Sequence, residues 1–279
     1  MQDTDLKRFA AEIRLNTLKC IGSLQEGHIG GSFSIAELLA VLYGKYMKYD
    51  PKNPKWDGRD RLVSSKGHAG PAYYSVLALK GFFPMDWLNT LNRVGTRLPS
   101  HCDRNLTPGI DMSTGSLGQG ISPAVGMAIA LKTRGTGERV YAVVGDGETN
   151  EGQIWEATML AVHMKLSNFI IFVDRNHGQV DGWTEDVLDI GDLAPKFRSF
   201  GCYVTECNGQ DTDDIDRAIA DVIANQGDKP GTVIMHTTKG AGSQSIVDLG
   251  PACHNIRFKP EQYAKALAEL EANLAAFDS

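Results

Sequence analysis

Apolar and polar residues alternate along the C-terminal half of the chain in blocks with the lengths of strands and helices. The apolar runs span residues 139–147, 168–176, 202–207 and 231–238, and the segments of helix length between them span 150–165 and 213–225. Continuous apolar strands separated by helices predict a parallel sheet that is covered by helices on both faces. The expected fold class is therefore α/β, with ligands bound at the carboxyl edge of the sheet.

The N-terminal half predicts more helix than strand. Apolar residues at helical spacing predict a first helix, and a second is expected over 34–47, where Ser34 and Glu37 have the spacing of a capping box. A strand is expected at 61–65 and helices are expected at 73–81 and 121–133. We find no repeat or linker, so residues 1–279 are expected to form a single domain.

Composition excludes several classes of protein. The 279 residues carry a formal net charge of −6 without a basic stripe, so a nucleic-acid partner is not expected. No apolar run approaches the roughly 20 residues of a membrane helix, and the first 20 residues lack a signal-peptide pattern. Five cysteines without paired spacing predict reduced thiols. We expect a cytoplasmic protein that does not bind membranes.

A Gly-Asp-Gly segment carries the first chemical signal. Asp146 ends one apolar run and Asn176 ends the next, so both side chains meet at one sheet edge if the two strands are neighbours. A carboxylate and an amide oxygen suit Mg²⁺, which completes its shell with phosphate oxygens and water. Gly145 and Gly147 allow close approach of the backbone to a phosphate, and a helix beginning near Asn150 would direct N–H groups there. The segment predicts a metal-bridged diphosphate, although a plain Gly-Asp-Gly turn remains the alternative.

Further motifs make the signal specific to one family. The chain contains, in order, "GHIGGS", "SKGHAGPA", "TGSLGQG", "GDGETNEGQIWEA" and "DRN". Together they resemble the N-terminal, diphosphate-binding domain of transketolase, over nearly the whole chain. The nearest form is the split transketolase, in which two shorter subunits share what is elsewhere one polypeptide. The resemblance implies thiamine diphosphate and Mg²⁺ as cofactors, and transfer of a two-carbon ketol unit from a ketose to an aldose, often phosphorylated, through a thiamine diphosphate adduct.

Four histidines in small-residue loops match the family's active-site positions. The resemblance implies that His28, His101 and His254 contact the donor ketose, and that His68 and His254 reach the diphosphate. A reaction that moves protons on and off hydroxyl groups needs side chains that titrate near neutrality, as imidazole does. The remaining histidines, His163, His177 and His236, are given no catalytic role.

The resemblance also implies the cofactor and metal ligands. The residues expected to bind the cofactor are His68, Gly115, Ser116, Leu117, Asp146, Gly147, Asn176 and His254, and the expected metal ligands are Asp146, Asn176 and the carbonyl of Gly178. Many relatives have proline in place of Ser116, a departure of little weight because contacts there are largely backbone and apolar.

The acidic residues after Asp146 are harder to interpret. Glu151 and Glu156 either couple two active sites across a subunit interface, as the resemblance implies, or simply favour a helix N-terminus. Glu148 and Lys66 are expected to be solvated or of local use, without an assigned role.

The chain is expected to hold only half of the catalytic machinery. In transketolases the glutamate that activates the cofactor and the residues that grip the sugar phosphate belong to a pyrimidine-binding domain, for which no pattern follows Thr238. A C-terminal subunit carrying that domain is the expected partner, in a heterotetramer. The alternatives are the α subunit of a thiamine-dependent 2-oxoacid dehydrogenase, and a non-catalytic regulator that binds the cofactor.

Overall fold

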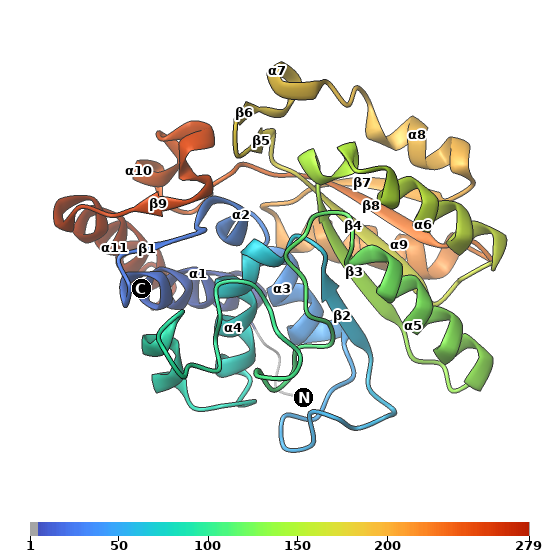
Figure 1. Ribbon diagram of the computed structural model, residues 1–279, viewed down its shortest axis with the longest axis horizontal. Helices are drawn as coiled ribbons and strands as arrows, with labels where there is room; N and C mark the ends of the chain where they lie inside the picture. The colour runs from blue at the N-terminus through green and yellow to red at the C-terminus, as the bar shows by residue number, and fades with distance from the viewer. Residues whose placement is uncertain (1–4, 279) are drawn as a thin grey trace.

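A five-stranded parallel sheet forms the centre of the molecule (Figure 1). The computed structural model describes residues 5–278, so the first four residues of the segment expected to lack a signal peptide lie outside it. The strands are β2 (Arg61–Ser64), β3 (Val140–Gly145), β4 (Phe169–Arg175), β7 (Tyr203–Asn208) and β8 (Gly231–His236). Their order is β2-β3-β4-β8-β7, with every pair parallel. The predicted α/β class is confirmed.

Helices cover both faces of this sheet. The longer ones are α1 (Leu6–Gly22), α3 (Ala36–Val41), α4 (Gly70–Leu79), α5 (Ile121–Arg134), α6 (Gly152–His163), α8 (Leu193–Phe200), α9 (Thr212–Asn225) and α11 (Pro260–Ala275). The shorter elements are α2 (Gly30–Phe33), α7 (Thr184–Leu188), α10 (Gln244–Val247) and two small antiparallel pairs, β1 (Glu26–Gly27) with β9 (Ile256–Arg257) and β5 (Gly178–Gln179) with β6 (Gly182–Trp183). None of the described helices combines the length and the apolar character needed to cross a membrane.

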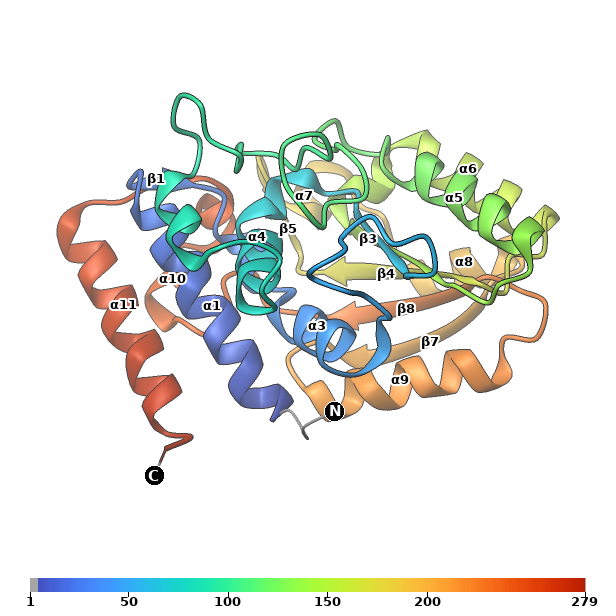
Figure 2. The same cartoon turned by 90° about the horizontal axis from the view of Figure 1, so that it is seen from below.

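Successive residues of a strand pack alternately into two separate hydrophobic cores. Tyr141 and Val143 of β3 pack into the core shared with α1, α3, α4 and α9, while Ala142 and Val144 pack into the core shared with α5, α6 and α8. Figure 2 shows α5 and α6 on one side of the sheet and α3 and α9 on the other. Both faces of β3, β4 and β8 are therefore buried, which explains why these strands read as continuous apolar runs, whereas the edge strand β7 is only partly buried.

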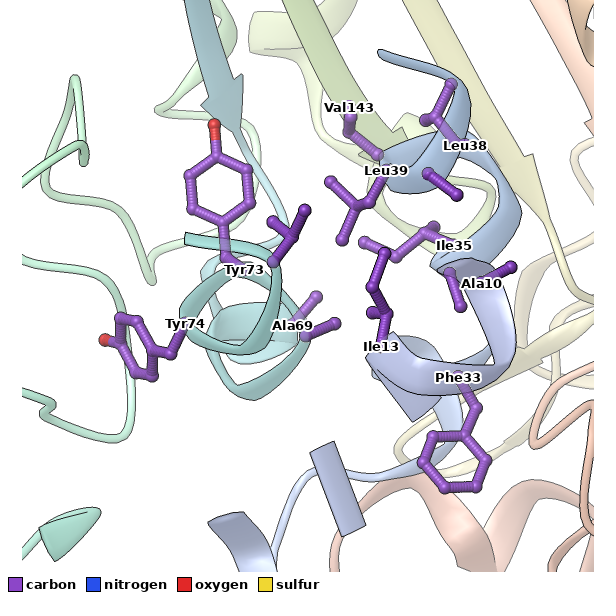
Figure 3. Close-up of a cluster of buried hydrophobic side chains, with 14 of the residues drawn as sticks. Ala10, Ile13, Phe33, Ile35, Leu38, Leu39, Ala69, Tyr73, Tyr74 and Val143 are labelled. Carbon is purple, nitrogen blue, oxygen red and sulfur yellow. The ribbon is translucent and has the colours of Figure 1, made fainter. Parts of the chain in front are cut away.

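The first core is tightly filled where α1 meets α3 and α4. Ala10 and Ile13 of α1 gather with Ile35, Leu39 and other apolar side chains between the helices (Figure 3). These four residues are at most 2 % exposed. This packing gives the loops between the helices a rigid base.

The predicted capping box at the second helix is wrong. The segment is broken into α2, α3 and a π-helical turn at Leu42–Tyr46, and α3 begins after Ile35 without a side-chain cap. The Ser34 hydroxyl instead donates a hydrogen bond of 2.7 Å to the carboxylate of Asp174, and Glu37 forms a buried ion pair with Arg14. Both candidate capping side chains are therefore used in long-range contacts.

The central strands meet the condition on which the metal prediction depends. β3 and β4 are neighbours, with Gly145 in register with Asp174. Asp146 continues this pairing, since its N–H donates to the carbonyl of Asp174 at 3.1 Å. The side chains that follow the two strands therefore leave the sheet at the same edge.

Candidate active site

Asp146 is a buried carboxylate with few partners. It is 2 % exposed and accepts hydrogen bonds from the N–H groups of His177 at 2.7 Å and Gly147 at 2.8 Å. Burial, with the nearby charge of Asp174, raises the pKa of Asp146 to about 6. A buried carboxylate whose charged form is disfavoured in this way is stabilised by a cation.

Asn176 lies on the neighbouring strand tip with a defined orientation. Its side chain is 6 % exposed; Nδ2 donates to the carboxylate of Asp174 at 2.6 Å, and Oδ1 accepts from the N–H of Gly178 at 3.1 Å. Asp146, Asn176 and Gly178 all line one cavity. Within residues 5–278 no group of three or more His, Cys, Asp or Glu side chains has the spacing of a metal site, so a cation here would need amide and carbonyl oxygens beside Asp146.

The four predicted histidines converge from four separate loops. The ring centroid of His28 lies 5.5 Å from that of His68, 5.3 Å from His101 and 5.4 Å from His254, and His68 and His254 are 4.7 Å apart. Glycine makes part of this packing possible, because a Cβ on Gly31 would stand 3.1 Å from Nε2 of His68. The sequence prediction that these residues share one site agrees with their placement.

Burial lowers the pKa of all four histidines of the cluster, which favours the neutral form of each ring. Burial, with the charges of His101 and Lys239, lowers the pKa of His28 to about 4, and burial with Lys239 lowers the pKa of His254 to about 3. Burial also lowers the pKa of His68 and of His101. Each ring therefore has one N–H donor and one acceptor nitrogen, which suits recognition of hydroxyl groups.

A cavity of about 210 Å³ lies between the strand tips and two of the four histidines, His68 and His254. It is lined by Lys66, His68, Leu117, Gly145, Asp146, Gly147, Glu148, Asn176, Gly178, Gln179, Val180, Asp181, Lys239 and His254. Lys239 was not predicted. Lys239 is 5 % exposed. Its ammonium donates a hydrogen bond of 2.6 Å to the carbonyl of Gly178 and lies 3.1 Å from Nδ1 of His254. Burial is the main cause that lowers the pKa of Lys239 to about 8.

The lining fits an anionic group bound together with a cation. Lys239 supplies positive charge, and Nε2 of Gln179 is buried without a hydrogen-bond partner among the described residues. Such an orphaned donor is stabilised by an anionic acceptor. Asp146 on the same wall requires the opposite charge. A diphosphate bridged by a divalent cation meets both requirements.

The "TGSLGQG" segment lies beside this cavity with unequal contributions. Leu117 lines the cavity, and Gly115 lies against the ring of His101, where a Cβ would stand 3.2 Å from a ring carbon. Ser116 is exposed and is not part of the lining. Its contact with the cofactor stays a prediction.

Of the two interpretations of Glu148 and Lys66, solvation or local use, the structure contradicts solvation, because both side chains are buried. Glu148 is 2 % exposed and accepts hydrogen bonds from the hydroxyl of Ser65 and the N–H groups of Gly118, at 2.8 Å, and Gly145, at 3.0 Å. It thereby joins three loops of the site. Lys66 is 1 % exposed and forms an ion pair of 2.6 Å with Asp174. Charged residues are rarely buried unless they are paired, and their partners here are distant in the sequence.

The helix expected near Asn150 begins later. Gly147–Asn150 forms a 3₁₀ turn, and α6 starts at Gly152 with Glu151 in the N-cap position. Glu151 and Glu156 are both exposed, and their proposed coupling of two active sites stays a prediction.

The other histidines lie apart from the cluster or at its border. His163 ends α6, and His236 ends β8, where its ring is 3.0 Å from the carboxylate of Glu206. His177 has a left-handed backbone with φ 61°, which directs its N–H toward Asp146. Its ring pairs with Glu185.

Comparisons with known proteins agree with this geometry. Residues 6–259 match the family described as transketolase, thiamine diphosphate binding domain. The chain is 50 % identical over 270 residues to SqwG, the 6-deoxy-6-sulfo-D-fructose transketolase subunit of Clostridium sp., covering 97 % of this chain and 98 % of that one. It is 40 % identical to one of the apulose-4-phosphate transketolase subunits of Actinobacillus succinogenes, covering 88 % of each.

Solved transketolases share the fold. A transketolase from Campylobacter jejuni superposes with a TM-score of 0.87 at 29 % identity, covering 99 % of this chain and 46 % of that one. The chain thus spans just under half the length of that enzyme. The predictions of a thiamine diphosphate site and of an N-terminal transketolase subunit are confirmed, in preference to a 2-oxoacid dehydrogenase subunit. The chain therefore belongs to the transketolase family, as the counterpart of its thiamine diphosphate-binding N-terminal half.

Proposed function

We propose that this chain is the cofactor-binding subunit of a two-chain transketolase that moves a two-carbon ketol unit from a ketose donor to an aldose acceptor. The observation that carries the proposal is the convergence of four loop histidines beside a buried Asp146 and Asn176. Structural packing alone does not require four histidines to cluster at the border of a cavity that two of them line. We further propose that residues 1–279 act as one domain.

The cofactor site is assigned to the edge formed by the β3 and β4 tips. Asp146, Asn176 and the carbonyl of Gly178 are the proposed Mg²⁺ ligands, while Lys239 and the unpaired amide of Gln179 face the diphosphate. In this arrangement Lys239 exchanges part of its contact with Gly178 for the anion. Bound thiamine diphosphate supplies the carbanion chemistry that breaks and forms the carbon–carbon bond.

The histidines are assigned to the sugar. His28, His101 and His254 bind donor hydroxyl groups and exchange protons with them, because neutral imidazoles both donate and accept hydrogen bonds. His68, behind His254 and next to Lys66, supports the diphosphate end of the cavity. This division of roles separates substrate chemistry from cofactor binding.

A second chain completes the proposed enzyme. Two relatives that this chain matches over nearly their full length are named as transketolase subunits, which supports a C-terminal partner subunit with the pyrimidine-binding domain. We propose a heterotetramer, because symmetric pairing of two such heterodimers is the simplest closed assembly. The five cysteines are all free and buried, which supports a reducing, cytoplasmic compartment.

The proposed substrate class comes from the names of two relatives. The sulfofructose enzyme and the apulose-4-phosphate enzyme are both named for ketoses with an anionic group. We propose an anionic ketose, with a sulfonate or a phosphate, as the donor. A panel that includes 6-deoxy-6-sulfo-D-fructose, apulose 4-phosphate and common ketose phosphates distinguishes these cases.

Reconstitution tests the proposal directly. The chain mixed with its partner subunit, Mg²⁺ and thiamine diphosphate is expected to transfer ketol units, while the chain alone is expected to give essentially no product. Asp146→Ala should abolish metal-dependent cofactor binding in calorimetry, whereas the exposed Asp186→Ala should not. Full activity without a partner would refute the two-chain model, and unchanged cofactor affinity in Asp146→Ala would exclude Asp146 as a ligand.

A further inference from the structure

Asp174 is a buried carboxylate with an unusually complete set of donors. It is 0 % exposed and is the penultimate residue of β4, next to the cavity. It accepts hydrogen bonds from Nζ of Lys66 at 2.6 Å, Oγ of Ser34 at 2.7 Å, Oγ1 of Thr237 at 2.5 Å and Nδ2 of Asn176 at 2.6 Å. Among these partners, Asn176 is the proposed metal ligand.

The ionised carboxylate decides which end of the Asn176 amide faces which way. A carboxylate paired with an ammonium can only accept, so the NH₂ end of Asn176 must turn toward Asp174 and its oxygen must turn away. The N–H of Gly178, which donates to that oxygen at 3.1 Å, is consistent only with this orientation. A flipped amide would set its NH₂ against the N–H of Gly178 and its oxygen against the carboxylate of Asp174.

Lys66 supplies the charge that makes a buried carboxylate tolerable here. Lys66 is 1 % exposed. Its ammonium donates hydrogen bonds of 2.6 Å both to the carboxylate of Asp174 and to the carbonyl of Gly31. Gly31 lies three residues after His28 in the "GHIGGS" loop. One side chain therefore connects the histidine loop to the strand tip that carries Asn176.

We propose that Asp174, held by Lys66, is a positioning residue that fixes the side-chain oxygen of Asn176 toward the cofactor's divalent cation. The inference rests on the proposed cofactor site. Residues that orient a metal ligand from behind commonly change metal affinity tenfold to a hundredfold when they are replaced. Asp174→Asn removes the orientation, because an amide at position 174 can pair with either end of Asn176.

A double-mutant cycle on the full chain with its partner subunit tests this role. Calorimetry gives the affinity for thiamine diphosphate at several Mg²⁺ concentrations for wild type, Asp174→Asn, Asn176→Ala and the double variant. We expect Asp174→Asn to bind about tenfold to a hundredfold more weakly at low Mg²⁺, with recovery at high Mg²⁺. The double variant should match Asn176→Ala within about twofold, because a residue that acts only through Asn176 has nothing further to lose.

A matched control separates positioning from general stability. Asp60 is also buried, at 4 % exposed, and its carboxylate accepts hydrogen bonds from the N–H groups of Lys48 and Arg139. It lies where β2 and β3 begin, whereas the cavity lies where the strands end. Asp60→Asn therefore makes the same chemical change away from the cavity. If Asp174→Asn does not fold, Lys66→Met/Asp174→Asn removes both charges and avoids a lone buried lysine. That variant then replaces Asp174→Asn throughout the cycle.

Three outcomes would overturn the inference. The first is an Asp174→Asn variant that binds cofactor as Asp60→Asn does. The second is a double variant whose losses multiply, which would mean that Asp174 acts independently of Asn176. In the third, wild type fails to bind thiamine diphosphate with Mg²⁺, and the proposed function fails together with the inference; the first two leave the proposed function intact.

Discussion

Asp146 is poised for a cation, so the cofactor-free chain should become more stable when this carboxylate is neutralised. The side chain is 2 % exposed, and burial together with the charge of Asp174 raises its pKa from 3.8 to about 6. A raised carboxyl pKa means that the folded state holds its proton longer than the unfolded state. Stability is therefore lost as pH rises from about 4 through about 6.

The size of the effect follows from the shift. Each pKa unit corresponds to about 1.4 kcal/mol, so ionised Asp146 destabilises the fold by about 3 kcal/mol at pH 7.5 and by about half as much at pH 5. Asp146→Asn removes the destabilisation that comes from the buried charge. It also turns an NH₂ group toward one of the two backbone N–H donors, which lowers the free energy of unfolding by about 1 kcal/mol. The variant should therefore gain about 2 kcal/mol at pH 7.5 and clearly less at pH 5.

Urea denaturation of the cofactor-free chain at both pH values measures this difference. Asp186→Asn, at an exposed position of α7, is the control for removing a carboxylate and should show neither gain. Addition of Mg²⁺ and thiamine diphosphate should reverse the order, since ligand at about 100 times Kd stabilises wild type by about 2.7 kcal/mol but not the variant. A variant less stable than wild type at pH 7.5, or a gain independent of pH, would refute the reasoning.

Three further variants test other parts of the structure. His28→Ala should lower kcat of the reconstituted pair by about 10²–10⁴ with little change in cofactor affinity; equal losses in kinetics and calorimetry would make His28 a structural residue. Arg14→Met leaves Glu37 buried without its partner and should lower the free energy of unfolding by about 3–5 kcal/mol, whereas Arg14→Met/Glu37→Leu should restore most of it in urea titrations. Gly67→Ala would place a Cβ 2.6 Å from the carbonyl carbon of Thr114, so its Tm should fall by an amount equivalent to about 1–3 kcal/mol. An unchanged Tm would contradict that contact.

The centre of the sheet was predictable from the sequence because β3, β4 and β8 are buried on both faces. Apolar runs at 139–147 and 168–176 contain β3 and β4 within their bounds, since a parallel strand between two helical layers has no polar face to interrupt the run. The region 30–47 was not predictable in the same way. There Ser34 is bonded to a residue 140 positions away, a contact that local capping rules cannot include.

The candidate site also contains residues that the sequence indicated and residues whose surroundings it could not indicate. His28, His68 and Asp146 stand in glycine-rich motifs, and Asn176 is marked by its distance from Asp146 along the chain. Lys66 stands in the same motif as His68, but nothing in the motif indicates that its side chain is buried. The ion-pair partner of Lys66 is Asp174, which is 108 positions away on β4. Without that partner in view, a lysine is expected to be exposed.

The buried charges of Asp146 and Lys239 explain why the cofactor and the fold should depend on each other. Among residues 5–278, Asp146 has no counter-charge within hydrogen-bonding distance, and Lys239, whose pKa burial lowers to about 8, contacts a carbonyl oxygen and an imidazole nitrogen. Each group is destabilised alone, and their needs are opposite. A cation and a diphosphate bound together satisfy both, whereas either one alone leaves the other charge uncompensated. Cooperative binding of metal and cofactor, each raising the affinity for the other, is therefore built into this wall of the cavity.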